Sequence, residues 1–129
     1  MANYVTHLQP ELAVNYCQLV IVWTDDPAST RAARQQLGAT FPFLCDHERN
    51  GIAELDIEDT TDASHPRIAI PYTFVLDGER VILRIYNGWW YVGRPTVEEL
   101  RMDLRALMSR RRDWWYDDTP APYARAAGQ

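Results

Sequence analysis

The sequence lacks lysine, and this is its clearest compositional gap. All 13 of its basic residues are arginines, which we attribute to the codon usage of a GC-rich genome, so we expect a bacterial source. Acidic residues outnumber basic ones by 18 to 13, and the formal net charge is −5. Because nonspecific affinity for nucleic acids depends on clustered positive charge, we expect no nucleic-acid partner.

The sequence also lacks a long apolar run. Its longest aliphatic stretch is LVIVW at residues 19–23, far shorter than the roughly 20 residues that cross a bilayer. The opening residues, MANYVTHLQPEL, contain no charged region followed by an apolar region, as a secretory signal would. We therefore expect a cytoplasmic protein with no membrane partner.

Cysteine is scarce, since only Cys17 and Cys45 are present and they form no Cys-x-x-Cys pair. In a reducing compartment both would remain thiols unless they take part in a transient redox reaction. Cys45 precedes Asp46 at the expected start of a helix, where backbone amides and the helix dipole favour a thiolate, although the neighbouring carboxylate opposes it. For both cysteines the alternative is a small core residue. Whether they pair in a disulfide depends on whether the fold brings their Cα atoms within about 7 Å.

Familiar cofactor and metal motifs are missing as well. The sequence contains no P-loop, no Gly-x-Ser-x-Gly and no Gly-x-Gly-x-x-Gly, so readings as an NTPase, a hydrolase or a dinucleotide-binding enzyme have no support. His7, His47 and His65 do not combine with Cys45 into a zinc-binding spacing. We therefore expect neither a metal nor a cofactor.

The apolar pattern predicts alternating strands and helices in one α/β layered domain. A continuous apolar run at 18–24 is typical of a strand covered on both faces. The expected strands are 18–24, 40–46, 72–77 and 80–86; the expected helices are 27–37, 47–55 and 95–112; and 56–67 is expected to be a surface loop. We expect this domain to span residues 1–112 and an aromatic tail to follow at 113–129.

Local signals mark the ends of two helices. Asp26 and Pro27 match the N-cap and first position of the helix at 27–37, and Gly38 stands where a left-handed residue ends a helix. Thr96 and Glu99 have the spacing of a capping box before the last helix.

The stretch IAIPYTFVLDGERVILRIYNG, residues 68–88, predicts two strands joined by an Asp-Gly hairpin turn. Pro71 at the head of the first strand is unusual, because proline cannot donate a hydrogen bond to a sheet.

Three stretches, in order, resemble peroxiredoxins of the alkyl hydroperoxide reductase and thiol-specific antioxidant type. They are FPFLCDHERNGIAEL at 41–55, IPYTFVLDGERVILRIYNG at 70–88 and GRPTVEELRMDLRAL at 93–107. The resemblance implies a thioredoxin-like sheet with a C-terminal hairpin and a closing helix. It also implies thiol-dependent antioxidant chemistry, with a peroxide and a thiol reductant as reaction partners.

The resemblance further implies that Pro71 is a cis-proline that lies against the redox site. The backbone of Ile70 would then be free to pair with a thiol-containing partner. Ile70, Pro71 and Tyr72 are therefore the expected partner-binding platform, and Trp89 and Trp90 beyond the hairpin are expected to extend it.

The sequence departs from the family before residue 18. The family's central strand and reactive-cysteine segment come ahead of the strand at 18–24, but here no cysteine precedes Cys17. We expect a fold that is N-terminally truncated relative to the family, either because the start lies inside a longer reading frame or because the redox segment has been lost. The open slot would be filled by another chain or by direct pairing of 18–24 with 72–77, which makes a homo-oligomer an expected partner.

Two functions follow from these observations. The first is a peroxiredoxin-like thiol oxidoreductase, inactive in this chain if the missing motif is essential; Cys45, and then Cys17, are the only residues that could start its reaction. The alternative is a non-enzymatic binding or assembly module that keeps the proline platform and the aromatic surface. The aromatic clusters at 89–91 and 114–116 fit either a subunit contact or packing of the tail over the hairpin end.

Overall fold

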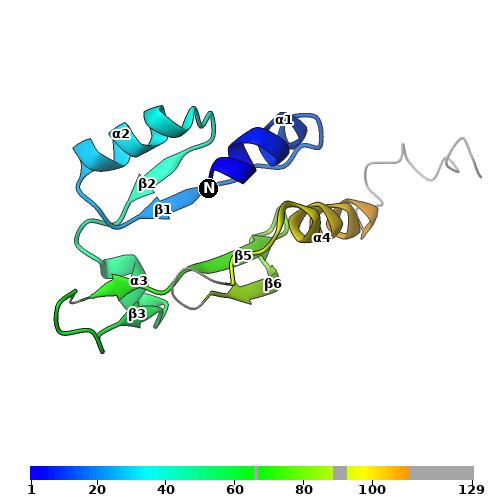
Figure 1. Cartoon of the computed structure of the whole chain (residues 1–129). Helices are drawn as coiled ribbons and strands as arrows, with labels where there is room; N and C mark the ends of the chain where they lie inside the picture. The colour runs from blue at the N-terminus through cyan, green and yellow to red at the C-terminus, as the bar shows by residue number, and fades with distance from the viewer. Residues whose placement is uncertain (66, 89–92, 111–129) are drawn as a thin grey trace, which may run out of the picture.

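A computed structural model describes residues 1–65, 67–88 and 93–110 of the chain, and all structural statements below concern these residues. Its helical segments are η1 (Tyr4–Leu8), α1 (Gln9–Leu12), α2 (Pro27–Leu37), α3 (Asn50–Glu54) and α4 (Val97–Arg110). Its strands are β1 (Ile21–Trp23), β2 (Phe43–Cys45), β3 (Glu58–Asp59), β4 (Ile68–Ala69), β5 (Tyr72–Leu76) and β6 (Ile82–Asn87). The elements alternate as the sequence predicts for an α/β domain (Figure 1).

The first half of the domain is a parallel β1–β2 pair connected by α2. Residue Trp23 of β1 is aligned with Cys45 of β2. The predicted ends of α2 are confirmed: the Asp26 carboxylate accepts hydrogen bonds from the backbone N–H groups of Ala28 at 2.9 Å and Ser29 at 3.0 Å. Gly38 has a φ of 66° and ends the helix.

The second half contains the antiparallel β5–β6 hairpin and α4. Both strands form as predicted, with Thr73 aligned to Tyr86. The turn differs from a two-residue Asp-Gly turn, because the left-handed residue is Arg80, with a φ of 66°. The Asp77 carboxylate holds this turn by accepting hydrogen bonds from the N–H groups of Glu79 and Val81, each at 2.9 Å. The turn is therefore stabilised by hydrogen bonds to the Asp77 side chain and not by a left-handed glycine.

A third strand pair, β3–β4, is antiparallel, and its first strand lies within the stretch 56–67 that the sequence predicts to be a surface loop. Glu58 is aligned with Ala69, and Asp59 with Ile68. Arg67 forms an ion pair with the Glu58 side chain across this pair. Strands of two residues leave no readable alternation, so the prediction of a loop over the whole of 56–67 was wrong at this point.

An N-terminal helix, η1 and α1, was absent from the predicted element order. Its buried residues Tyr4, Leu8 and Leu12 recur at a spacing of four, which is a helical signal. Pro10 obscures this signal, because proline inside a helix removes a hydrogen bond and clashes with the preceding turn. The structure places Pro10 in the first turn of α1, directly after η1, where a helix tolerates proline.

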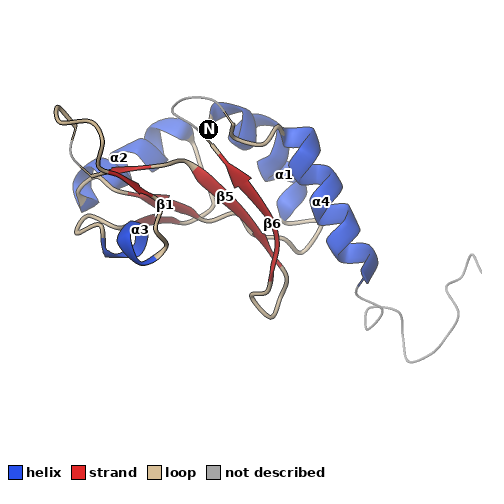
Figure 2. Ribbon diagram, turned by 90° about the horizontal axis from the view of Figure 1, so that it is seen from below, coloured by secondary structure: helices blue, strands red, loops and turns tan. Residues whose placement is uncertain are grey.

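The buried core joins this helix to the hairpin and the last helix. Its members are 8 % exposed or less and comprise Tyr4, Leu8, Leu12, Val75 and Leu100. Figure 2 shows α1 and α4 side by side next to the hairpin. The hydroxyl of Tyr4 donates a hydrogen bond to the Pro95 carbonyl at 2.5 Å and ties the N-terminus to the start of α4.

The three strand pairs remain separate ladders within the described residues. β1 pairs only with β2, and β5 pairs only with β6. Direct pairing of 18–24 with 72–77, one of the two ways expected to fill the open slot, is therefore not formed. One edge of β1 and one edge of β5 are left without backbone partners from the ladders.

Across this part of the chain, every helix is too short or too polar to span a bilayer.

Candidate functional site

Cys45 lies at the carboxyl end of β2, where β1 and the start of α2 meet. In α/β folds, ligands bind at this edge of parallel strands. The Cys45 side chain is exposed, and its Sγ donates a hydrogen bond to the carbonyl oxygen of Asp25 at 3.0 Å. The backbone N–H of Asp46 donates to the Trp23 carbonyl at 2.7 Å, which continues the β1–β2 ladder past the cysteine. Cys45 is thus positioned at an accessible edge by two hydrogen bonds to backbone carbonyls, one from its own Sγ and one from the N–H of the next residue.

The Asp46 carboxylate next to Cys45 caps α3 across a short loop. It accepts hydrogen bonds from the N–H groups of Gly51 at 3.1 Å and Ile52 at 3.0 Å. Desolvation by burial alone would raise the pKa of Asp46, but the backbone hydrogen bonds and the nearby Arg49 lower it overall. Asp46 thus caps the helix through its side chain, although α3 begins later than predicted and its N-cap position is Arg49. The negative charge of Asp46 opposes formation of a thiolate at the adjacent cysteine.

Cys17 lies in a different environment, directly after the turn that follows α1. The residue is half-buried and packs against the core cluster. Its Sγ donates a hydrogen bond to the Asn15 carbonyl at 3.2 Å. Burial raises the pKa of the Cys17 thiol, which reduces the thiolate population near neutral pH.

The structure does not bring the two cysteines together. Both are free thiols. Cys45 is aligned with Trp23, whereas Cys17 precedes Trp23 by six residues along the same chain direction. Cys17 therefore lies before the start of β1, whereas Cys45 lies at the far end of the β1–β2 pair.

The predicted platform at Ile70, Pro71 and Tyr72 begins β5, but its backbone differs from the expectation. No peptide bond within the described residues is cis, so the bond before Pro71 is trans and the prediction of a cis-proline was wrong. The trans form is favoured by about 0.5–1 kcal/mol unless the surroundings oppose it. Here the trans geometry lets the Tyr72 N–H donate to the Ile70 carbonyl at 2.9 Å.

The backbone of Ile70 is also not free to pair with a partner. Its N–H donates a hydrogen bond to the Ile57 carbonyl at 2.8 Å, and its carbonyl accepts the bond from Tyr72. The β3–β4 pair, which the sequence did not predict, places Ile57 there. The expectation of an open backbone group at Ile70 was therefore wrong.

Gly88 fixes Pro71 from the other side. The Gly88 N–H donates to the Pro71 carbonyl at 2.9 Å, and a Cβ on Gly88 would lie 2.4 Å from that oxygen. Only glycine permits this approach. Trp89 and Trp90, which were expected to extend the platform, lie outside the described residues, as does the predicted tail at 113–129.

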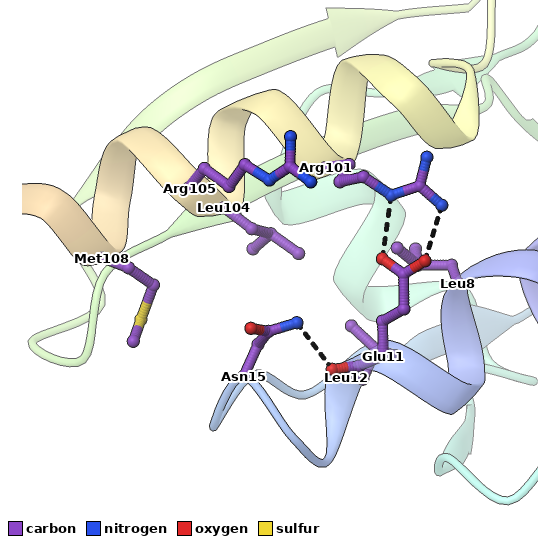
Figure 3. Close-up of a pocket in the computed structure, with 8 residues that line it drawn as sticks. All are labelled: Leu8, Glu11, Leu12, Asn15, Arg101, Leu104, Arg105 and Met108. Atoms are coloured by element: carbon purple, nitrogen blue, oxygen red, sulfur yellow. Dashed lines mark hydrogen bonds and ion pairs between the residues drawn. The ribbon is translucent and has the colours of Figure 1, made fainter.

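A second polar site, not singled out from the sequence, joins α1 to α4 (Figure 3). Arg101 donates two parallel hydrogen bonds to the Glu11 carboxylate, from Nε at 2.8 Å and from Nη2 at 2.7 Å, and Nη1 donates to Glu98 at 2.6 Å. The hydrogen bonding from Arg101 lowers the pKa of Glu11. The three-residue spacing of Glu98 and Arg101 predicts an ion pair on one face of a helix. Glu11 lies 90 residues from Arg101, so no local sequence pattern indicates that these two side chains pair.

No group of three or more histidine, cysteine or acidic side chains could hold a metal ion in the part of the chain that the structure describes.

The fold is that of the peroxiredoxin type of thioredoxin-like proteins. Reduced Prx3 from Vibrio vulnificus, solved in complex with H2O2, matches with a TM-score of 0.66 and 16% identity over 80% of this chain and 66% of that one. Mycobacterium tuberculosis AhpC matches with a TM-score of 0.69 and 24% identity over 85% of this chain and 61% of that one. The chain thus spans about two thirds or less of the length of these structures.

The sequence model of the AhpC/TSA family matches residues 1–85. The chain therefore belongs to the AhpC/TSA family, and the resemblance seen in its sequence is confirmed. No curated protein sequence matches the chain.

Proposed function

We propose that the protein is a thiol-dependent oxidoreductase of the peroxiredoxin type in which Cys45 is the thiol that meets the oxidant. Membership of the AhpC/TSA family supports the class of chemistry. The observation that carries the choice of residue is exposure: Cys45 is accessible at the carboxyl edge of β2, whereas Cys17 is half-buried against the core. The arginine-only set of basic residues supports a bacterial source, and the proposed setting is one in which thiol reductants are available.

In the proposed reaction the Cys45 thiolate attacks one peroxide oxygen. The O–O bond breaks, the cysteine is oxidised to a sulfenic acid, and the other oxygen leaves as water or an alcohol after taking up a proton. A second thiol then attacks the sulfenic sulfur, water leaves, and a disulfide forms. Because Cys17 lies at the opposite end of the β1–β2 pair, that second thiol comes from an external reductant. A further reductant thiol then attacks the mixed disulfide, breaks its S–S bond, releases Cys45 as the thiolate and leaves the reductant as a disulfide.

We expect this turnover to be slow. Reactive cysteines are activated by nearby cations or helix N-termini, whereas Cys45 donates its hydrogen bond to a carbonyl and adjoins the ionised Asp46. The missing Cys-x-x-Cys motif acts in the same direction.

The test is consumption of hydrogen peroxide with excess dithiothreitol, compared among the wild type, Cys45→Ser and Cys17→Ser. We expect the wild type to exceed the protein-free rate, Cys45→Ser to fall to that rate, and Cys17→Ser to stay within about twofold of the wild type. Trapping of sulfenic acid followed by peptide mass spectrometry should locate the modification at Cys45. Equal rates for the wild type and Cys45→Ser would reject the assignment.

A second candidate function, a non-enzymatic assembly module, is favoured by a different observation. One edge of β1 and one edge of β5 lack ladder partners within the described residues. Apolar side chains on the strands are also exposed, with Val22 at 58% and Ile85 at 52%. Such edges and side chains support association with another strand.

A further inference from the structure

A cavity of about 240 Å³ lies between α1 and α4, and neither cysteine is among the residues that line it (Figure 3). Its apolar wall is formed by Leu8 and Leu12 from the N-terminal helix and by Leu104 and Met108 from α4. Figure 3 shows Leu104 and Met108 directed from α4 toward the N-terminal helix. An apolar surface with few polar groups at its rim is the usual composition of a small-molecule site.

One part of the polar rim is already satisfied. The guanidinium of Arg101 is held by Glu11 through two hydrogen bonds and by Glu98 through a third. The Glu11 charge is thereby neutralised by a bidentate arginine, the strongest form of this contact. This pair fixes the spacing of α1 and α4 and has little capacity left to bind a ligand.

Arg105, one helical turn further along α4, is different. It lines the same cavity, and within the described residues its guanidinium forms neither a hydrogen bond nor an ion pair. Its positive charge acts on the cavity: the hydrogen bond from Arg101 is the main cause of the lowered pKa of Glu11, and the charge of Arg105 makes a smaller contribution in the same direction. A cation without a partner beside an apolar wall favours an anionic group attached to an apolar body.

We propose that this cavity binds a small organic carboxylate. The carboxylate accepts hydrogen bonds from the Arg105 guanidinium, and the hydrocarbon body lies against Leu8, Leu12 and Leu104. The volume of about 240 Å³ is below the range of drug-sized pockets, which restricts the ligand to a short chain or a single ring. This site contains no cysteine and does not depend on the proposed thiol chemistry.

Two methionines on α4 can report whether a ligand binds in the cavity. Met108 lines the cavity, whereas Met102 on the same helix is 61% exposed and lies outside its lining. In the full chain labelled with ¹³C at the methionine methyl groups, titration with hexanoate should shift the Met108 signal and leave the Met102 signal unchanged. Hexan-1-ol, which has the same body without the charge, and acetate, which has the charge without the body, should each bind about tenfold more weakly or worse.

Variants of Arg105 test the cationic partner. Arg105→Gln should weaken hexanoate binding by about tenfold, and Arg105→Lys should retain part of the affinity because the charge remains. Arg110→Gln removes an exposed arginine of the same helix that does not line the cavity and should leave binding unchanged. Since Arg105 is exposed and has no hydrogen-bond or ion-pair partner among the described residues, these variants should fold as the wild type does.

Several outcomes would overturn the proposal. They are an unshifted Met108 signal at saturating hexanoate, equal shifts of Met102 and Met108, equal affinity for hexanoate and hexan-1-ol, or equal affinity of Arg105→Gln and the wild type. None of these outcomes depends on peroxide turnover, so they leave the assignment of Cys45 unaffected.

Discussion

Tyr86 illustrates how one side chain couples the hairpin to α4. Its hydroxyl donates a hydrogen bond to the Asp103 carboxylate at 2.5 Å, and Arg84 approaches the other oxygen of Asp103 at 3.3 Å. The hydrogen bond to Asp103, followed by desolvation, raises the pKa of Tyr86 to about 12 from 10.0. The protonated tyrosine is therefore favoured in the folded state.

This pKa shift predicts a pH dependence of stability. Because the folded pKa is raised above the unfolded value of 10.0, the contribution of Tyr86 is fully present below pH 10 and is lost as the pH rises toward 12. We expect Tyr86→Phe to lower the free energy of unfolding by about 1 kcal/mol at neutral pH. The difference from the wild type should shrink above pH 10 in urea unfolding experiments.

Tyr72→Phe is the matched control, since the Tyr72 hydroxyl forms no hydrogen bond with the described residues. It should change the unfolding free energy little at any pH. A loss in Tyr86→Phe that stays constant from pH 7 to pH 11 would contradict the assigned cause.

The two cysteines show what could be read at this scale. For Cys17, next to an apolar strand, the sequence left two roles open, a reactive thiol or a small core residue. The structure places Cys17 half-buried against the core. Cys45 was placed at a helix start, but α3 begins five residues later at Asn50, and Asp46 reaches it through its side chain. Exposure of Cys45 depends on packing around the carboxyl edge of β2, which no residue pattern reports.

Among the elements, α2 and α4 were the most predictable, because their ends depend on contacts within one turn. The capping box of α4 forms as predicted: the Glu99 N–H donates to Thr96 Oγ1 at 3.1 Å, and the Thr96 N–H donates to Glu99 Oε2 at 2.7 Å. The helix that follows carries Leu100 into the core and Arg101 to Glu11. The position at which α4 starts therefore sets both a buried contact, through Leu100, and a polar contact, through Arg101.

Loss of this cap should destabilise the protein measurably. Thr96→Ala removes the acceptor for the Glu99 N–H and should lower the free energy of unfolding by about 1 kcal/mol in urea denaturation. Ser109→Ala is the control at the other end of α4, where the hydroxyl donates to the exposed Ala106 carbonyl at 2.8 Å; it should cost much less. Equal losses in both variants would show that the cap is not the cause.

Two elements escaped prediction for physical reasons. The N-terminal helical segment contains Pro10, which the interior of a helix normally excludes, and the change from η1 to α1 that places Pro10 in a first turn has no local signature. The β3–β4 pair depends on contacts across a loop rather than on alternation within either strand. Without it, the engagement of the Ile70 backbone could not be foreseen.

At the scale of the whole molecule, the three separate ladders leave unpaired strand edges within the described residues. Exposed apolar side chains lie on the same strands, with Val22 on β1 at 58% and Ile82 on β6 at 50%. Burial of such surface against a second copy is favourable and would also satisfy the backbone groups. This is the physical basis for the expected homo-oligomer.

We therefore expect concentration-dependent self-association in sedimentation velocity. Val22→Glu places a charge on β1 and should shift the distribution toward the monomer. Val14→Glu is the matched control, because Val14 is 76% exposed and lies outside every strand; it should associate as the wild type does. A wild type that sediments as a monomer at all concentrations would reject the assembly function and the role of the open edges.

The sequence by itself determined the order of most elements, the caps of α2 and α4, the β5–β6 hairpin and membership of the peroxiredoxin-like family. These features depend on residues a few positions apart, or on ordered motifs along the chain. Only the tertiary structure decided that Pro71 is trans, that Ile70 is bonded to Ile57, and that Cys17 and Cys45 lie apart. It also decided the pairing of Glu11 with Arg101 and the cavity beside them. Contacts between residues up to 91 positions apart depend on how the elements pack, and neither periodicity nor spacing encodes that packing.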